Sequence, residues 1–474
     1  MDKAEMLPAG FVPPGEKRAA AQPFCRVQAT ARPSSDSDIK FEMWLPDASH
    51  WNGRFLANGG GGNSGAIMYS RLTEGLARGY ASLSTDNGHV SKNGNIHEQS
   101  WAVGHPQKVI DFGYRAQAVT AVAGKQITRA FYGSPASKSY WIGCSQGGGK
   151  GLMQAQRYPE NFDGIVAGAP VLDWTGSMFS PAWVSVKGMR DPAQAVPRAK
   201  LPMIHKAVLA ACDARDGLVD GLLQEPGKCK FDPATIACSP GKNGDACLTP
   251  GEVTAMKRFW APIPGNDGRP VFPGSPYGAE LASAWLGQTE PGVSSWAWFW
   301  RGPMFEDPSY DIAGKLNVDD ASDLFVARQK LGATYDAVDP DLGRFAARKG
   351  KLIVWHGLHD ELITALRTKQ YVDEVNDTMG PQRTSSFMRA YFPPGVNHCR
   401  GGVGPIPEEY DLLSKVVNWV EKDQVPEAVT AVHRNAAGEV DRTMPVCPYP
   451  QIARYDGKGS PDVASSFSCR TPSR

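Results

Sequence analysis

Short hydrophobic runs recur along the chain, and polar or glycine-rich segments separate them. Such runs are typical of β-strands, and we expect strands at residues 39–45, 54–57, 80–84, 139–142, 165–170 and 351–355. The run at 39–45 alternates between apolar and polar residues, which predicts a half-exposed strand. Longer segments predict helices at residues 72–78, 150–157 and 408–421. Strands that alternate with helices favour an α/β fold with a mostly parallel sheet.

This alternation of strands and helices is interrupted between residues 171 and 345. The stretch is rich in Trp and Pro and contains four cysteines, but it has few strand-like runs. We therefore predict one core in two parts, residues 1–170 and 346–474, with an inserted domain at residues 171–345. Residues 1–35 are rich in Pro, Ala and Ser, and we expect them to form an arm.

The sequence Gly143-Cys144-Ser145-Gln146-Gly147 lies between an expected strand and an expected helix. It matches the G-x-S-x-G nucleophile elbow, in which a sharp turn lifts the serine Oγ out of the sheet. The flanking glycines are needed because the turn leaves no room for side chains. The pattern predicts that Ser145 is a nucleophile. The alternative is a glycine-rich turn with a bystander serine.

An acid and a histidine follow in the order Ser…Asp…His that α/β-hydrolases use. Asp360 comes just after the strand expected at 351–355, where a carboxylate can orient a histidine. Glu361 is the rival acid, and Asp360 has the alternative role of capping a helix over residues 362–368. His398 follows in a loop rich in Pro and Gly and is the predicted general base. The other histidines, including His356 and His359 beside the acid, are expected to be structural.

The four glycines at 59–62 follow the strand expected at 54–57. In α/β-hydrolases, one oxyanion donor is the N–H after the nucleophile and the second comes from a loop in this region. We therefore predict the N–H groups of Gln146 and Gly61 as the two donors. The alternatives are a flexible loop and a phosphate cradle, although the latter lacks its G-K-[ST] ending.

Composition narrows the possible partners. Hydrophobic residues make up 41% and charged residues 21% of the chain, and the formal net charge is +1. These values are ordinary for a globular protein, and no dense Lys/Arg run favours nucleic acid or an anionic membrane. No apolar run approaches the length of a membrane span. We expect a monomer that acts on a small molecule.

The nine cysteines do not have the C-x-x-C spacing of zinc ribbons or thioredoxin-like sites. Three pairs are close in sequence and predict local disulfide bonds: Cys212/Cys229, Cys238/Cys247 and Cys447/Cys469. If Cys144 and Cys399 are bridged, their Cα atoms lie roughly 4.4–6.8 Å apart, which forces Ser145 and His398 into one neighbourhood. The count is odd, so at least one thiol has no partner within the chain, and Cys25 is the candidate.

Cysteines in loop-rich sequence favour an oxidising compartment. The first residues do not form a signal peptide, so we expect either that a signal has been removed or that the protein is cytosolic with reduced thiols. We favour the first.

Residues 213–222 place Asp213, Asp216 and Asp220 on one loop that glycines interrupt. Three carboxylates on such a loop suit a hard cation, and calcium takes six to eight or so oxygen ligands. From the spacing alone, a calcium site and a solvated acidic turn are equally good interpretations.

Together these motifs resemble the tannase and feruloyl esterase family over nearly the whole chain. The matching features are Gly143-Cys144-Ser145-x-Gly147-Gly148, Trp355-His356-Gly357-x-x-Asp360, His398-Cys399 and the tail Cys447-Pro448-Tyr449-Pro450. The resemblance implies an α/β-hydrolase core, with the insertion as a large lid, and a secreted or periplasmic protein. It also implies the Cys144–Cys399 bridge and a structural Ca²⁺ in the lid. The expected calcium ligands are the carboxylates of Asp213, Asp216 and Asp220 and the carbonyls of Leu218 and Leu222.

The activity that the resemblance implies is hydrolysis of aromatic acid esters of the feruloyl, hydroxycinnamoyl or galloyl type by a Ser-His-Asp triad. Hydrolysis of mono(2-hydroxyethyl) terephthalate is the alternative, and no organic cofactor is implied. Two other classes of function stay open: a non-catalytic ligand-binding protein on a hydrolase scaffold, and a serine peptidase.

Overall fold

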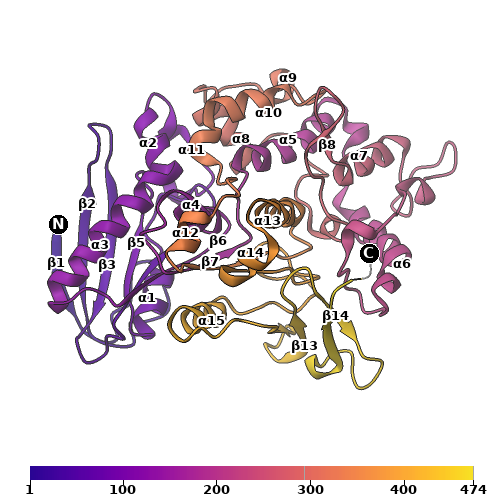
Figure 1. Ribbon diagram of the computed structural model, residues 1–474. Coiled ribbons are helices and arrows are strands. Elements are labelled where there is room, and N and C mark those ends of the chain that lie inside the picture. The colour runs from indigo at the N-terminus through magenta and orange to yellow at the C-terminus, as the bar shows by residue number, and fades with distance from the viewer. Residues whose placement is uncertain (293, 473–474) are drawn as a thin grey trace.

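The computed structural model describes residues 1–292 and 294–472, and this part of the chain contains a nine-stranded sheet (Figure 1). The strand order is β1-β2-β3-β5-β4-β6-β7-β10-β11. The strands are β1 (Lys3–Leu7), β2 (Phe24–Ala31), β3 (Ile39–Pro46), β4 (Arg54–Asn58), β5 (Ala81–Thr85), β6 (Lys138–Cys144), β7 (Gly164–Gly168), β10 (Lys351–Trp355) and β11 (Met388–Tyr391). Strands β5 to β11 in this order pair in parallel, whereas β1, β2 and β3 add antiparallel strands at one edge. The prediction of a mostly parallel sheet is confirmed.

Helices cover both faces of this sheet because neighbouring strand residues point to opposite sides. On β4, Phe55 packs in the core under α3 (Ala116–Tyr132), α4 (Gln146–Arg157) and α13 (Ala365–Met379). The next residue, Leu56, packs in the core on the other face, which α1 (Tyr69–Ala77) and α15 (Glu409–Lys422) cover. Two shorter helices are α14 (Pro381–Phe387), which packs in the same core as Phe55, and α2 (Pro106–Ile110), which packs against the core of residues 171–345.

The N-terminal part of the chain differs from its prediction. Residues 1–35 contain β1 and β2, so the expected arm is wrong: β2 pairs along its whole length with β3. The prediction of a half-exposed β3 is also wrong, because only Lys40 in this strand is exposed. Phe41 and Met43 pack on one side of β3 and Trp44 packs on the other, so helices bury both faces of an apparently alternating strand.

Residues 171–345 form a mainly helical region that occupies the top and right of Figure 1. Its helices are α5 (Trp174–Arg190), α6 (Leu201–Cys212), α7 (Pro250–Trp260), α8 (Ser295–Phe299), α9 (Ile312–Lys315), α10 (Ser322–Ala327), α11 (Ala333–Tyr335) and α12 (Gly343–Ala347), the last of which ends at the return to the core. The short strands β8 (Ile263–Pro264) and β9 (Pro270–Phe272) pair with each other. The aromatic side chains of Phe179, Trp296 and Trp300 lie in a hydrophobic core of this region.

The chain ends in two small antiparallel pairs at the lower right of Figure 1. They consist of β12 (Val429–Arg434) with β13 (Val440–Val446), and β14 (Ile452–Tyr455) with β15 (Phe467–Arg470). The Cys447–Cys469 disulfide joins the end of the first pair to β15.

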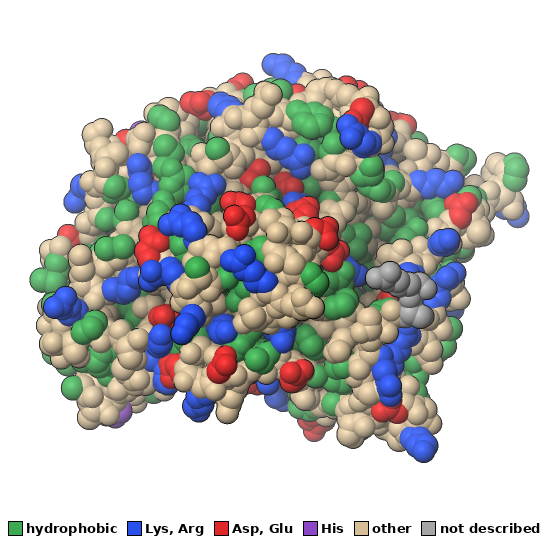
Figure 2. Space-filling model, viewed as in Figure 1, with side chains coloured by type: hydrophobic (Ala, Val, Ile, Leu, Met, Phe, Trp, Pro, Cys, Tyr) green, Lys and Arg blue, Asp and Glu red, His purple; other side chains and the backbone are tan. Residues whose placement is uncertain are grey.

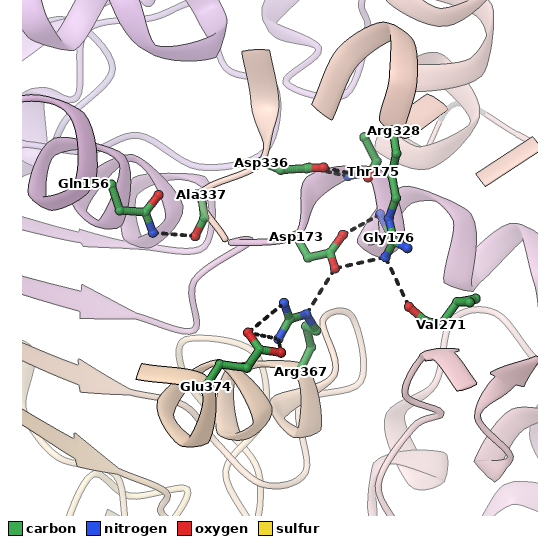
Figure 3. Close-up of polar contacts among 10 residues, drawn as sticks. All are labelled: Gln156, Asp173, Thr175, Gly176, Val271, Arg328, Asp336, Ala337, Arg367 and Glu374. Atoms are coloured by element: carbon green, nitrogen blue, oxygen red, sulfur yellow. Dashed lines mark hydrogen bonds and ion pairs between the residues drawn. The ribbon is translucent and has the colours of Figure 1, made fainter. Parts of the chain in front are cut away.

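A polar cluster fastens the inserted region to the core (Figure 3). Asp173 precedes α5, and its Oδ2 accepts hydrogen bonds from Arg328 Nη2 at 3.2 Å and from Arg367 Nε, on the core helix α13, at 3.0 Å. Near the end of the insertion, Asp336 accepts hydrogen bonds from the backbone and the hydroxyl of Thr175. The two crossings between core and insertion are thus tied together beside a cleft of about 750 Å³.

The surface carries both signs of charge. Figure 2 shows Lys and Arg side chains interspersed with Asp and Glu on the face in view. Across residues 1–292 and 294–472, the helices lack the length and apolar character that a membrane-spanning segment needs.

Candidate active site

Ser145 lies at the sharp turn between β6 and α4. Its backbone has φ of 62° and ψ of −123°, a conformation that costs energy for a residue with a side chain and that clusters at functional sites. Hydrogen bonds hold the turn in place: the Ser145 N–H donates to Gly168 O at 2.9 Å, and Ser145 O accepts from Gly149 and Val171. The predicted strand–elbow–helix geometry is therefore present, with α4 beginning at Gln146 rather than at residue 150.

Glycine lets the loop at 59–62 touch the helix behind Ser145. A Cβ on Gly147 would lie 2.9 Å from the backbone of Gly59, and a Cβ on Gly59 would lie 2.4 Å from Gly147 Cα. Both distances are too short for a side chain, so bare backbone is required at this contact. The Gly147 N–H donates to Gly60 O at 3.0 Å, which fixes the glycine loop against the start of α4.

The predicted oxyanion donors, Gln146 and Gly61, lie on the two sides of this contact. In the described part of the chain, neither backbone N–H donates a hydrogen bond to another protein group. A Cβ on Gly61 would meet nothing within 4 Å, so open space borders its Cα. The two N–H groups stay the predicted donors for a developing negative charge.

Ser145, His398 and Asp360 form one continuous chain of hydrogen bonds. The Ser145 hydroxyl donates to His398 Nε2 across 2.8 Å, and His398 Nδ1 donates to Asp360 Oδ2 across 2.6 Å. The serine and the histidine are 253 positions apart in the sequence. Such a chain can move a proton from the hydroxyl to the imidazole while the carboxylate holds the ring.

Electrostatics favour an ionised acid and a readily protonated histidine. Burial alone would raise the pKa of Asp360, but the charges and hydrogen bonds of His398 and His356 outweigh it and hold this pKa well below its usual range. Burial would lower the pKa of His398, but the charge of Asp360 and its hydrogen bond raise it above the ordinary value. An ionised carboxylate beside a readily protonated imidazole suits a general base that becomes a cation during the reaction.

Asp360 orients His398 with one oxygen and holds the following loop with the other, and it does not cap a helix. Its second oxygen, Oδ1, accepts the backbone N–H groups of Leu362 at 2.9 Å and Ile363 at 2.8 Å. These residues form a turn and not the expected helix over 362–368, because α13 begins at Ala365. One carboxylate therefore shapes the loop with one oxygen and orients His398 with the other.

The two histidines beside the acid differ. His356 is fully buried and lies between Asp360 Oδ2, at 2.9 Å, and the hydroxyl of Thr368, at 2.8 Å. His356 supports the acid loop, as expected. His359 is also buried, which lowers its pKa to about 3, and it makes an edge contact with the ring of His205.

The rival acid, Glu361, lies next to the histidine but does not contact its ring nitrogens. Its Oε2 accepts the backbone N–H of His398 at 3.0 Å. From the sequence, Glu361 is a possible replacement for Asp360, and this second position at the His398 backbone was not predicted. The only signal was the adjacency of the two acids in the sequence.

All four expected disulfide bonds are present. Cys144 and Cys399 are bridged with a Cα–Cα distance of 6.0 Å, directly beside Ser145 and His398. The local pairs Cys212–Cys229, Cys238–Cys247 and Cys447–Cys469 are bridged as well. Cys25 is buried and is the unpaired cysteine among the described residues, as predicted.

The acidic loop of the insertion is folded around its own carboxylates. Asp213 Oδ2 accepts the N–H of Gly221, Asp216 Oδ1 accepts that of Leu218, and Asp220 Oδ1 accepts that of Leu222. Burial, followed by the charges of Asp220 and Asp213, raises the pKa of Asp216 to about 6.

Within residues 1–292 and 294–472, no group of three or more His, Cys, Asp or Glu side chains is arranged to hold a metal ion. The carboxylates of Asp213, Asp216 and Asp220 are oxygen donors of the type that calcium prefers, and each accepts a backbone N–H of the loop. Calcium at this loop stays a prediction.

Comparisons with known proteins agree with this geometry. The sequence model of the family "Tannase and feruloyl esterase" matches residues 25–470. Mono(2-hydroxyethyl) terephthalate hydrolase of Piscinibacter sakaiensis is 32% identical, with 97% of this chain and 87% of that protein covered. Probable feruloyl esterase B-1 of Aspergillus flavus is 32% identical, with 95% and 87% covered. The crystal structure of feruloyl esterase B from Aspergillus oryzae has a TM-score of 0.89 at 28% identity, with 99% of this chain and 96% of that chain covered.

The chain therefore belongs to the tannase and feruloyl esterase family, and it is a carboxylic-ester hydrolase with the α/β-hydrolase fold.

Proposed function

We propose that this protein hydrolyses esters of aromatic carboxylic acids through an acyl-enzyme on Ser145. The observation that carries the proposal is the unbroken hydrogen-bond chain from Ser145 Oγ through His398 to Asp360 Oδ2. The names of the feruloyl esterase relatives support a hydroxycinnamoyl acyl group, and galloyl esters belong to the same proposal through the family description.

The reaction has two halves. Ser145 Oγ attacks the ester carbonyl carbon while His398 Nε2 takes the hydroxyl proton, and the N–H groups of Gln146 and Gly61 bind the oxyanion. His398 then gives its proton to the leaving alcohol, which leaves the acyl group on Ser145. A water molecule attacks the acyl-enzyme with His398 again as the base, and the free acid departs. Asp360 keeps the imidazole oriented and stabilises its positive charge throughout.

A terephthalate monoester is the second substrate class. The name of the Piscinibacter sakaiensis relative supports it, since that protein is as similar in sequence as the feruloyl esterase relative. In both classes the bond that breaks is an ester to an aromatic acyl group, so the same triad chemistry serves either substrate.

Ser145→Ala tests the mechanism. We expect loss of ester turnover by a factor on the order of 10⁴ or more with an unchanged fold, because only Oγ is removed. Ser386→Ala is the matched control, since its exposed hydroxyl bonds only to the carbonyl of Arg383. Methyl ferulate, methyl gallate and mono(2-hydroxyethyl) terephthalate would be compared by kcat/KM. Near-normal hydrolysis by Ser145→Ala would contradict the assignment.

Two further assays test the other classes of function. A non-catalytic binding protein would not be labelled at Ser145 by a serine-reactive phosphonate. A peptidase would turn over the matching aromatic amides as well as the esters.

We also propose a structural calcium ion at the acidic loop and a secreted or periplasmic monomer. The carboxylates of Asp213, Asp216 and Asp220 and the carbonyls of Leu218 and Leu222 would hold the ion, which would neutralise crowded charge and take no part in the chemical steps. The disulfide bonds support an oxidising compartment.

A further inference from the structure

Two adjacent carboxylates hold His398 at two different places. Asp360 accepts the ring Nδ1–H at 2.6 Å, and Glu361 accepts the backbone N–H at 3.0 Å. The mechanism above uses only the first contact. The second contact fixes the backbone nitrogen of His398 and therefore limits the positions that its ring can take.

The loop that carries His398 is held by the Cys144–Cys399 bridge and by backbone hydrogen bonds at Gly395 and Val396, while the N–H of His398 itself is bonded to Glu361. Cys399, the next residue, has a φ of 61°, and Gly395, Gly401 and Gly402 have φ values of 70°, 73° and 96°. The loop is a tight glycine turn in which the Asn397 N–H donates to Gly401 O and the Arg400 N–H donates to His398 O. A charged acceptor on the backbone N–H of His398 is a strong restraint at this point of the loop.

We propose that Glu361 is a positioning residue of this esterase, which fixes the main chain of His398 for proton transfer and adds negative charge beside the imidazole. This inference rests on the proposed function. Glu361 acts through His398 and touches neither Ser145 nor the ring nitrogens.

The charged groups around His398 determine in which direction its pKa moves when Glu361 is changed. Asp360 and Glu361 both favour the protonated imidazole, whereas Arg400 opposes it. His356 faces Asp360 from the strand end. Burial, followed by the charge of Asp360, raises the pKa of Glu361, while the N–H of His398 favours its charged form. Removing the charge of Glu361 should therefore make His398 easier to deprotonate.

Two substitutions distinguish the effect of Glu361 on the position of His398 from the effect of its negative charge. Glu361→Gln keeps the shape and an oxygen acceptor for the His398 N–H but loses the charge. Glu361→Ala loses both. Glu374→Gln is the matched control, because this acid pairs with Arg367 on α13 and makes no contact with the triad. The rates of an aromatic ester would be measured from pH 5 to 9 for the full chain, together with melting temperatures.

For Glu361→Gln we expect kcat on the alkaline plateau to stay within about threefold of wild type. The acidic limb of the kcat/KM profile should move to lower pH by about half a unit. For Glu361→Ala we expect kcat to fall by about tenfold or more at every pH with KM nearly unchanged, because misplacement of the base costs rate and not binding. Glu374→Gln should match wild type in both.

The inference is overturned if Glu361→Ala keeps wild-type kcat and Glu361→Gln leaves the acidic limb in place while Ser145→Ala is inactive. A purely structural acid would lower the melting temperature in Glu361→Ala without moving the acidic limb in Glu361→Gln, and that result also overturns it. Activity in Ser145→Ala is a different outcome, which rejects the proposed function itself.

Discussion

Replacing Cys144 and Cys399 together by Ala should weaken both stability and catalysis. The bridge joins positions 255 residues apart. In the chain-entropy relation, a closed loop of that length corresponds to about 5.5 kcal/mol of stabilisation, which is an upper figure because unfolded chains retain structure. Both cysteines are changed at once so that no lone thiol is left beside Ser145.

The bridge should affect catalysis because it holds the nucleophile and the base in position. The bridge is next to Ser145 on one side and His398 on the other, and their contact is a single 2.8 Å hydrogen bond. Loosening this contact should lower kcat by about tenfold or more and change KM less, since small misplacements cost rate steeply.

The Cys238–Cys247 disulfide of the inserted region provides the matched control. Its partners are nine residues apart, which corresponds to about 2.6 kcal/mol in the same relation. The double Ala variant at these positions should lower the melting temperature by a smaller amount and leave kcat unchanged. Melting temperatures and steady-state kinetics on one ester would be compared for the three proteins. If the Cys144/Cys399 variant keeps wild-type kcat, or loses no more activity than the control, the bridge has no positioning role and the reasoning is refuted.

Two further predictions concern charge. If calcium occupies the acidic loop, a chelator should lower the melting temperature and added Ca²⁺ should restore it, whereas Asp216→Asn should reduce both effects; an unchanged melting curve and no metal in elemental analysis would count against the site. Burial, followed by the charge of Asp173, raises the pKa of Asp336 to about 7, and Arg328 opposes the shift. The native state then binds more protons than the unfolded state between about pH 4 and pH 7, so this group should make stability fall as pH rises through that range. Asp336→Asn should remove that part of the slope, and an identical slope in both proteins would show that Asp336 does not titrate there.

The sequence alone determined the features that depend on a few neighbouring residues. Gly143, Ser145 and Gly147 predicted the elbow, because a turn without room for side chains needs small residues at fixed positions. The strand at 351–355 was predicted with the bounds that β10 has, since a short apolar run is itself the local signal of a buried strand. The local disulfide pairs followed from spacing, because two cysteines that are close in the sequence can meet without help from the rest of the fold.

The tertiary structure decided which distant groups meet. The sequence favoured Asp360 over Glu361 as the acid but gave no position for Glu361. The path of the loop turns the Asp360 carboxylate toward the ring of His398 and the Glu361 carboxylate toward its main chain. The strands in residues 1–35 were missed because pairing stabilises them: β1 lies at the edge of the sheet against β2, and β2 lies between β1 and β3. The contact of Asp173 with Arg367 joins positions 194 residues apart, and no local signal encodes it. Such contacts depend on strand order and on the direction of each side chain, which are fixed only when the sheet and its helices pack together.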